Sequence, residues 1–447
     1  MRAKTEEQQL ERLLRQDPSG ARAYLYQTPP QPLLRTVRRL SRADRARAFR
    51  LLNEAEALPL FVGLDASEQT DLITDLPSSS RAHLFDGLEP DDRARLLDQL
   101  PATVSAPLLA GLEETDRAAT LGLTAYPARS TGRVMSPEVV SVRNDQSASS
   151  ALAHVREHGS TAETVYMLPV LGQDDRVVGV VSLRRLLFTE PDTPLHEVMS
   201  AHAITVSVDQ DPEEAARVVR AARLIAAPVV DSGGRLAGVL TVDDAMRILA
   251  DAEEEDVARS AGSIPLRRSY RATPVFELVR SRIGWLLVLI VAATLTVNVL
   301  DFFEETLAQA VTLALFVPLL IGTGGNAGAQ SATTVVRAMA VGDVEDRDVP
   351  RVVAREVGAG AVLGVILAAV AVVPAALFAD FGIAVVVCVS LVVICVLATF
   401  VGSVTPLVAR RIGVDPAVVS APLISTLVDA SGLIIYFLVA RAVLGLS

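Results

Sequence analysis

Five long apolar runs after residue 284 constrain the fold of this chain more than any other feature. They cover residues 285–300, 307–339, 357–378, 383–408 and 416–446. A helix of about 20 apolar residues is long enough to cross the hydrocarbon core of a bilayer. The first 280 residues are instead rich in Arg, Asp and Glu. We therefore predict a soluble part followed by an α-helical membrane domain of five transmembrane helices, residues 281–447.

One carboxylate, Asp429, lies in the middle of the fifth apolar run. An unpaired ionised carboxylate at this depth costs on the order of 3 kcal/mol or more, so it normally faces a pore, a partner or an ion. A structural partnership with a buried arginine or hydroxyl is the alternative. No arginine lies in the apolar core of any run, which favours the pore.

Proline and glycine crowd the second run, in the sequence FVPLLIGTGGNAGAQSATT. We expect this composition to break the helix, and broken backbone at membrane depth is tolerated where it is buried or lines a watery cavity. Asn326 and neighbouring carbonyls would then face a pathway. The alternative is close helix packing through small residues four apart, as in Gly324, Gly328 and Ala332.

The start of the fifth run also contains prolines that we expect to disturb its helix. Asp415 can cap a helix and Pro416 suits its first turn. Pro422 lies seven residues before Asp429, and we expect it to free carbonyls near Ala421 and Ser425.

The resulting ligand set consists of oxygen alone. The two cysteines, Cys388 and Cys395, lie in one apolar run, and the last histidine is His202. Carboxylate, amide and carbonyl oxygens without thiolate or imidazole select hard cations such as Mg²⁺. No nucleophile, general base or phosphate-binding loop stands out, so we predict no catalytic residues and no enzyme.

The soluble part opens with a repeat, which we assign to an all-α N domain at residues 1–130. Leucines recur every twelve residues, at Leu64, Leu76, Leu88, Leu100 and Leu112. Each unit predicts a short capped helix and a turn, which must stack on its neighbours to bury an apolar face. The chain has a formal net charge of −11, and its acidic soluble part disfavours nucleic acid and favours cations.

A duplication follows. VMSPEVVSV and LPVLGQDDRVVGVVSLRRLL pair with VMSAHAITVSV and APVVDSGGRLAGVLTVDDAM later in the chain. Each copy predicts strand, helix, strand, strand and helix, with Gly179 and Gly238 between the paired apolar runs. This order resembles an α+β tandem pair of CBS domains over residues 131–250.

An acidic connecting helix and linker, residues 251–280, join the two parts. The helix includes the sequence AEEEDVA, with Glu255 and Asp256, and it is placed to act as a lever.

The charged N-terminus contains no apolar signal segment. Arginines flank the second and third runs and the fourth and fifth runs, so the positive-inside rule predicts a cytoplasmic N-terminus and a multi-pass protein of the plasma membrane. The preference for arginine over lysine points to GC-rich coding and a bacterial source.

PLLIGTGGNAGAQSATTVVRAMAVGDV and RRIGVDPAVVSAPLISTLVDASGLIIY resemble the signature of the MgtE family of magnesium channels. The order of helical N domain, CBS pair, acidic helix and five membrane helices extends this resemblance over nearly the whole chain. The family implies a Mg²⁺-selective channel or transporter with a homodimeric pore, gated by cytoplasmic Mg²⁺ sensed in the N and CBS domains.

The resemblance also implies roles for single residues. Asp429 would hold a hydrated ion, Ser425 would lend a backbone carbonyl, and Asn326 would line the adjacent pore. Glu255, Asp256 and Asp415 match positions that hold regulatory Mg²⁺ between the connecting helix, called the plug, and the membrane domain.

Four residues depart from the family pattern. Ala329 and Ala421 stand where asparagines are usual, and Arg247 interrupts the acidic face of the connecting helix. Arg185 replaces an aspartate that typically contacts a nucleotide ribose, whereas the second repeat keeps Thr241 and Asp244. We therefore expect weak or absent ATP binding, with any residual binding at Thr241 and Asp244.

Other functions stay open from the sequence. A broader divalent-cation transporter, for Co²⁺ as an example, with weak or absent Mg²⁺ gating is the alternative, as is proton-coupled exchange. A membrane-anchored nucleotide sensor would have no use for broken helices or a midplane carboxylate.

Overall fold

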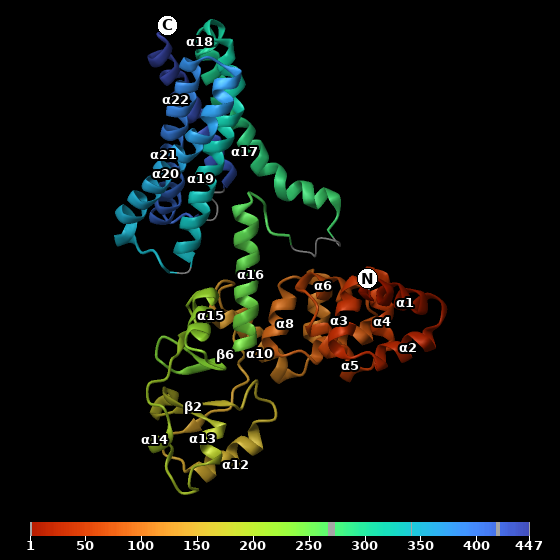
Figure 1. Cartoon of the computed structure of the whole chain (residues 1–447). Coiled ribbons are helices and arrows are strands. Elements are labelled where there is room, and N and C mark those ends of the chain that lie inside the picture. The colour runs from red at the N-terminus through yellow and green to blue at the C-terminus, as the bar shows by residue number, and fades with distance from the viewer. Residues whose placement is uncertain (1, 267–272, 341, 417–420, 447) are drawn as a thin grey trace. The chain divides into compact units, whose positions relative to one another are not determined.

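The computed structural model describes residues 2–266, 273–340, 342–416 and 421–446 (Figure 1). The chain divides into two compact units. The soluble unit contains the described residues up to Ala252, and the membrane unit begins at Glu253.

The N domain is built from short helices in two stacked rows. Along the chain they are α1 (Arg2–Gln16), α2 (Pro18–Gln27), α3 (Pro30–Arg39), α4 (Arg42–Leu51), α5 (Glu54–Val62), α6 (Ala66–Asp75), α7 (Ser78–Asp86), α8 (Pro90–Leu97), α9 (Ala102–Gly111) and α10 (Glu114–Thr124). Helices α4, α6, α8 and α10 pack in sequence along one row, and α5, α7 and α9 pack along the other. The predicted helical stack is therefore present.

The twelve-residue leucines explain why each helix begins where it does. Each of the five leucines directly precedes a helix N-cap residue and is no more than 8% exposed. A buried apolar residue just before the cap fixes the angle at which the chain enters the helix. The repeat thus supplies both the turn and the core of the stack.

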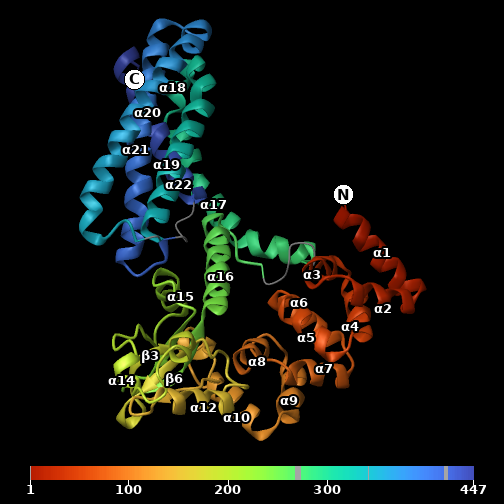
Figure 2. The same ribbon diagram turned by 60° about the horizontal axis from the view of Figure 1, so that its bottom comes forward.

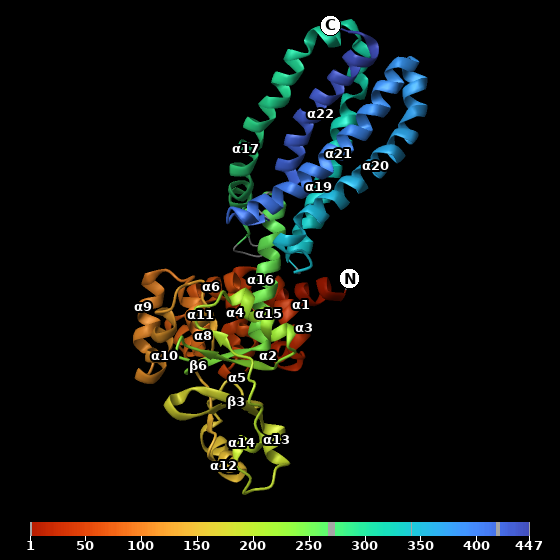
Figure 3. The same cartoon turned by 90° about the vertical axis from the view of Figure 1, so that its left-hand side faces the viewer.

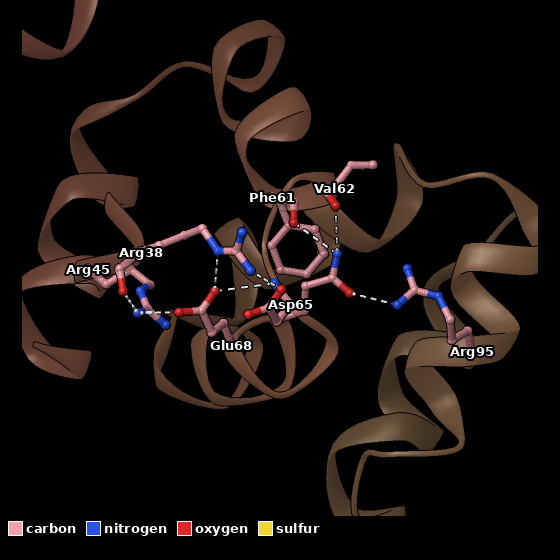
Figure 4. A network of polar contacts seen from close by, with 8 residues as sticks. Arg38, Arg45, Phe61, Val62, Asp65, Glu68 and Arg95 are labelled. Atoms are coloured by element: carbon pink, nitrogen blue, oxygen red, sulfur yellow. Dashed lines mark hydrogen bonds and ion pairs between the residues drawn. The ribbon is translucent and has the colours of Figure 1, made fainter. Parts of the chain in front are cut away.

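A second period of twenty-four residues is visible in buried polar side chains. Arg45, Gln69 and Arg93 each sit at the fourth position of their helix and donate to the backbone carbonyl eight residues earlier, at 3.2, 2.9 and 3.2 Å. Figure 4 shows Arg45 with Glu68, which accepts from Arg45 at 2.8 Å and from Arg38 at 3.3 Å. Because buried polar groups are costly when unpaired, these bonds fix the pairing of successive helices. The structural repeat is a helix pair.

The CBS pair consists of two three-stranded sheets with the same order. The first repeat contains β1 (Val142–Arg143), α12 (Ala148–His158), β2 (Met167–Leu171), the 3-10 turn η1 (Gln173–Asp175), β3 (Val177–Ser182) and α13 (Leu183–Leu187). The second contains β4 (Val206–Ser207), α15 (Pro212–Ala221), β5 (Ala226–Val230), β6 (Leu236–Thr241) and α16 (Val242–Ser260), after the short helix α14 (Leu195–Val198). The middle strand of each sheet is parallel to the first and antiparallel to the third.

Gly179 and Gly238, which separate short apolar runs in the sequence, lie inside β3 and β6. A Cβ on Gly179 would be 2.7 Å from the carbonyl oxygen of Ser200, and one on Gly238 would be 2.5 Å from that of Ser136. Each glycine therefore admits the VMS segment that precedes the other repeat, which forms bridges with that strand. The two CBS repeats are thus joined because each one pairs with the VMS segment that precedes the other.

The N domain and the second CBS repeat share one hydrophobic core. Ala94 of α8 and Leu123 of α10 belong to the same cluster as Met135, Val229 and Leu240. The short helix α11 (Thr131–Val134) packs against α8 and β6. The soluble unit is thus continuous across its two predicted domains.

The membrane unit contains five helices that are long and apolar enough to cross a bilayer, counted over the described residues. They are α17 (Val275–Phe302), α19 (Val317–Ala340), α20 (Val349–Phe378), α21 (Phe381–Arg411) and α22 (Ala421–Leu444), with α18 (Glu304–Gln309) and the 3-10 segments η2 (Val311–Phe316) and η3 (Asp346–Asp348) between them. Figures 2 and 3 show this bundle from two further sides. The last part of α16, from Glu253, also belongs to this unit.

The expected break at the glycine cluster is wrong. Helix α19 is continuous from Val317 through all four glycines, and the irregular backbone lies upstream, at Ala310 and in η2. Pro318 is the second residue of α19, where a proline costs no helical hydrogen bond. Glycine without a Cβ lowers helix propensity by about 1 kcal/mol, which tertiary packing can offset.

The proline of the fifth run also leaves its helix unbroken. Pro422 is the second residue of α22, and the helix is regular past Ser425. The expected freeing of carbonyls near Ala421 and Ser425 is therefore not found. The predicted helix start at Pro416 falls partly outside the described residues, since 417–420 are not described.

The arginine-flanked ends of the helices lie together. Arg410 near the end of α21 donates to the carbonyl of Val344, which lies between α19 and α20, at 3.1 Å. Val335, Val344 and Leu407 form a small core at this end. At the other end, Tyr436 of α22 donates to the carbonyl of Leu313 at 2.9 Å. Hydrogen bonds therefore tie the helices of the bundle together at both ends.

Candidate functional site

Helices α19 and α22 meet through the glycines of α19. A Cβ on Gly324 would lie 2.6 Å from Ile394 and 3.0 Å from Val428, and one on Gly328 would lie 3.1 Å from Ile424. Such separations are shorter than normal van der Waals contact, so only glycine permits this approach. The close-packing alternative for the glycine cluster is the one that the structure supports.

Asp429 lies at this contact. A Cβ on Gly325 would collide with the Ser425 hydroxyl and lie 3.2 Å from Oδ1 of Asp429. Ser425 and Asp429 are one helical turn apart on α22, so both face α19 at the same place. The structure thus joins Asp429, Ser425 and Gly325, of which the sequence analysis had singled out the first two as ion ligands.

The Asp429 carboxylate has an oxygen without a protein donor. Its side chain is half-buried, and Oδ1 is shielded from solvent and has no hydrogen-bond partner among the described residues. A buried acceptor of this kind is costly unless water or an ion satisfies it. The carboxylate is therefore available to a ligand.

Asn326 is placed differently. It follows Gly325 on α19, so its side chain points about 100° round the helix from the Gly325 contact. The side chain is exposed in the single chain. Asn326 can line a pathway beside Asp429, but it does not touch that carboxylate across the α19–α22 contact.

A second group of carboxylates lies at the connecting helix. Arg259 of α16 forms ion pairs with both Glu255 and Asp415. Two of the three acidic residues predicted to hold a regulatory cation are therefore joined by a guanidinium in this structure. Asp256 takes part in an interaction of its own and is not free.

Arg259 was not among the site residues predicted from the sequence. The spacing of four residues between Glu255 and Arg259 is the signal that could have identified it, because residues at i and i+4 are neighbours on a helix. Its partner Asp415 is 156 positions away in the chain, and no local pattern predicts that contact.

The segment after α16 is fastened to the first membrane helix. Ile264 donates to the carbonyl of Ser281 at 2.9 Å. Gly262 has a φ of +67° and lies so close to Trp285 that a Cβ would collide with the indole. Within the membrane unit, residues 253–266 are thus held to α17 and to Asp415.

The predicted nucleotide residues are engaged with each other. Thr241 is 5% exposed and donates to Asp244 at 3.0 Å, and Arg247 pairs with the same carboxylate at 2.5 Å. Arg185 lies on α13 with an exposed side chain. A ribose at the second repeat would have to compete with the existing bonds of Asp244.

Comparison with known proteins covers the chain in three parts. Residues 317–439 match the family model described as a divalent cation transporter, residues 28–129 match the MgtE intracellular N domain, and residues 132–191 and 195–251 match the CBS domain. The magnesium transporter MgtE of Thermus thermophilus is 40% identical over 323 residues, which is 72% of each chain. This chain belongs to the MgtE family.

Further relatives agree with this assignment. The magnesium transporter MgtE of Enterococcus faecalis is 30% identical over 71% of this chain and 70% of its own length. The crystal structure of the cytosolic domain of the Mg²⁺ channel MgtE in complex with ATP is 31% identical, with a TM-score of 0.50, and covers 54% of this chain and 98% of its own. The predicted combination of helical N domain, CBS pair and membrane helices is confirmed, and MgtE proteins are transporters rather than enzymes.

Proposed function

We propose that this chain conducts Mg²⁺ across the membrane through a pore lined by α19 and α22. The unpartnered Asp429 carboxylate, in the middle of a membrane-length helix at a glycine-lined contact, is the observation that supports it. Its relatives are named magnesium transporters. Burying a carboxylate at this depth costs free energy, and binding a permeating cation would offset that cost.

The pore would bind the ion with its water. Mg²⁺ loses its hydration shell reluctantly and binds proteins through few carboxylates, and one Asp429 carboxylate from each of two chains would suit that behaviour. We therefore propose a homodimer with the pore between subunits, Ser425 as an oxygen ligand beside Asp429, and Asn326 along the adjacent wall. Because α22 is regular at Ser425, its hydroxyl is the oxygen that we assign to this role.

Gating would act through Glu255, Asp256 and Asp415. A cation that binds these carboxylates more tightly in the closed than in the open state shifts the population toward closed. The connecting segment is held to α17 and to Asp415, so a change there reaches the membrane helices. We place the soluble unit in the cytoplasm of a bacterium, where it senses cytoplasmic Mg²⁺.

The second candidate is a broader divalent-cation transporter, for Co²⁺ as an example, with weak Mg²⁺ gating. Arg259 supports the weak Mg²⁺ gating of this second candidate, because its guanidinium already neutralises Glu255 and Asp415. A regulatory Mg²⁺ would have to displace it. Arg247 has the same effect on Asp244.

Uptake into liposomes tests the proposal. Purified protein should admit Mg²⁺ down its gradient, and the flux should be the same with and without a proton gradient. Competition by Co²⁺ at equal concentration separates the two candidates. Absence of Mg²⁺ flux from correctly folded protein would remove the proposed function.

Gating needs a separate experiment. The triple variant Glu255→Gln, Asp256→Asn and Asp415→Asn should conduct at millimolar internal Mg²⁺, where the wild type is closed. If wild-type flux is already insensitive to internal Mg²⁺, the arginines have replaced the switch.

A further inference from the structure

Two histidines lie one helical turn apart on the same face of α12, in the first CBS repeat. His154 and His158 belong to the sequence HVREH, and the helix ends at His158. Their ring centroids are 4.4 Å apart, and the ring planes differ by 32°. His154 is partly exposed and His158 is exposed. Neither residue is among the proposed pore and gating residues.

One hydrogen bond fixes the position of the proton on the His158 ring. Nδ1 of His158 lies 3.2 Å from the backbone carbonyl oxygen of His154. A carbonyl oxygen can only accept, so in the neutral ring Nδ1 carries the hydrogen and Nε2 holds the free lone pair. Metal-binding histidines usually donate their other ring N–H in this way, which orients the ring. His158 is thus prepared to bind an ion through Nε2.

The spacing of the two rings suits one shared ion. Side chains on a helix lean toward its N-terminus, so the His158 ring extends over the turn that carries His154. Two imidazoles that bind one ion through nitrogen at about 2.0–2.1 Å have ring centres about 4.5–5.5 Å apart. The observed centroid distance of 4.4 Å needs only a small side-chain rotation to reach that range. Histidines at i and i+4 on a helix are a recurring metal-binding pair.

The charges around the pair favour a cation. His158 is the last residue of α12, and the partial negative charge at a helix C-terminus attracts positive ligands. Glu157 is exposed next to His158. Arg156 projects from the helix about 160° away from both histidines. Its guanidinium therefore does not lie on the histidine face of the helix.

The ligand type selects the class of ion. Imidazole suits transition metals such as Zn²⁺, Cu²⁺ and Ni²⁺, whereas Mg²⁺ prefers oxygen ligands. HVREH also fits the H-x-x-E-H pattern of one class of zinc enzymes, but a catalytic zinc needs a third protein ligand. Among the described residues, no third His, Cys, Asp or Glu side chain lies close enough to share an ion with both rings. The pair therefore suits a binding site completed by water.

We propose that His154 and His158 form a two-histidine site for a divalent transition-metal ion on the first CBS repeat. The site differs from the oxygen sites for Mg²⁺ in its ligand chemistry, and it does not depend on the proposed conduction of Mg²⁺. Because water fills the remaining coordination positions, the bound ion exchanges with solvent. Occupancy then follows the free concentration of the ion.

Calorimetric titration of Zn²⁺ into the full chain in detergent tests the site. Excess Mg²⁺ in the buffer occupies the oxygen sites, and protein without a polyhistidine tag avoids foreign imidazoles. The wild type should bind one Zn²⁺ that His154→Gln and His158→Gln each weaken by about tenfold or more, because each variant removes one of two ligands. His196→Gln changes an exposed histidine on α14 and, as the matched control, should bind Zn²⁺ as the wild type does.

Cu²⁺ gives a second readout, which reports the ligating atoms directly. The electron paramagnetic resonance spectrum of the bound ion should show coupling to two nitrogens in the wild type and in His196→Gln, and to fewer in His154→Gln and His158→Gln. Both of these variants should unfold close to the wild-type temperature without metal, so that lost binding reports a lost ligand. Wild-type Zn²⁺ affinity in both variants, or a Cu²⁺ spectrum without nitrogen coupling, overturns the site, whether or not the pore conducts.

Discussion

Two groups of carboxylates in the membrane unit, Asp429 and the pair Glu255 and Asp415, differ in whether a protein side chain neutralises them. Asp429 has a buried oxygen with no hydrogen-bond partner among the described residues, whereas Glu255 and Asp415 share Arg259. A carboxylate without a fixed partner can bind an ion and release it, as conduction requires. Carboxylates joined by a guanidinium are satisfied without metal, and an ion must compete for them. We therefore expect the same residue type to serve transport in one place and to resist ion binding in the other.

The largest expected effect is at Asp429. Asp429→Ala should reduce Mg²⁺ flux in liposomes to background and leave the protein folded, because no buried countercharge is left unpaired. Asp301→Asn, an exposed carboxylate at the end of α17, is the matched control and should retain flux. Wild-type flux in Asp429→Ala would end the comparison, since the unpartnered carboxylate would then have no role in conduction.

The glycine contact sharpens the comparison. Gly325→Ala places a methyl group against the Ser425 hydroxyl, and overpacking of this kind costs about 1–3 kcal/mol. Both flux and thermal stability should fall. Gly322→Ala on the same helix meets nothing within 4 Å and should leave both unchanged. Equal behaviour of the two variants would mean that α19 and α22 do not approach closely in the working protein.

Arg259 tests the other side of the comparison. Arg259→Gln removes the internal cation, so less Mg²⁺ should be needed to close the channel. An exposed or half-exposed ion pair contributes up to about 1 kcal/mol, so the half-inhibiting Mg²⁺ concentration should fall by up to about fivefold. Flux measured against internal Mg²⁺ gives this value, with Arg280→Gln on α17 as the control. A rise in that concentration would show that Arg259 assists closure.

The smallest effect concerns ATP. Calorimetric titration of the full chain should show weak or no binding, since Arg185 cannot accept hydrogen bonds from a ribose and Asp244 is held by Thr241 and Arg247. Any residual binding should be lost in Asp244→Ala. Micromolar binding that survives Asp244→Ala and disappears in Arg185→Ala would assign the site to the first repeat.

Much of the fold could be predicted from local pattern. The twelve-residue leucines, the duplicated strand and helix order, and the five apolar runs each correspond to elements of the structure. These predictions succeed because burial repeats along the chain with the period of the element that it stabilises. The prediction of a helix break at the glycines was wrong for the opposite reason. Propensity argued against a helix, and contacts of Gly324 and Gly328 with Ile394 and Val428, which no local window contains, override propensity.

The sequence by itself determined the kinds of residue available: a midplane carboxylate, oxygen ligands, small residues in α19 and an acidic connecting helix. Composition and period are local properties, so the chain order reveals them. Only the tertiary structure decided which carboxylates are already paired with a charged protein side chain. Arg259 reaches Asp415 across the chain. Electrostatic interaction depends on distance in space and on burial, and the sequence specifies neither until the chain has folded.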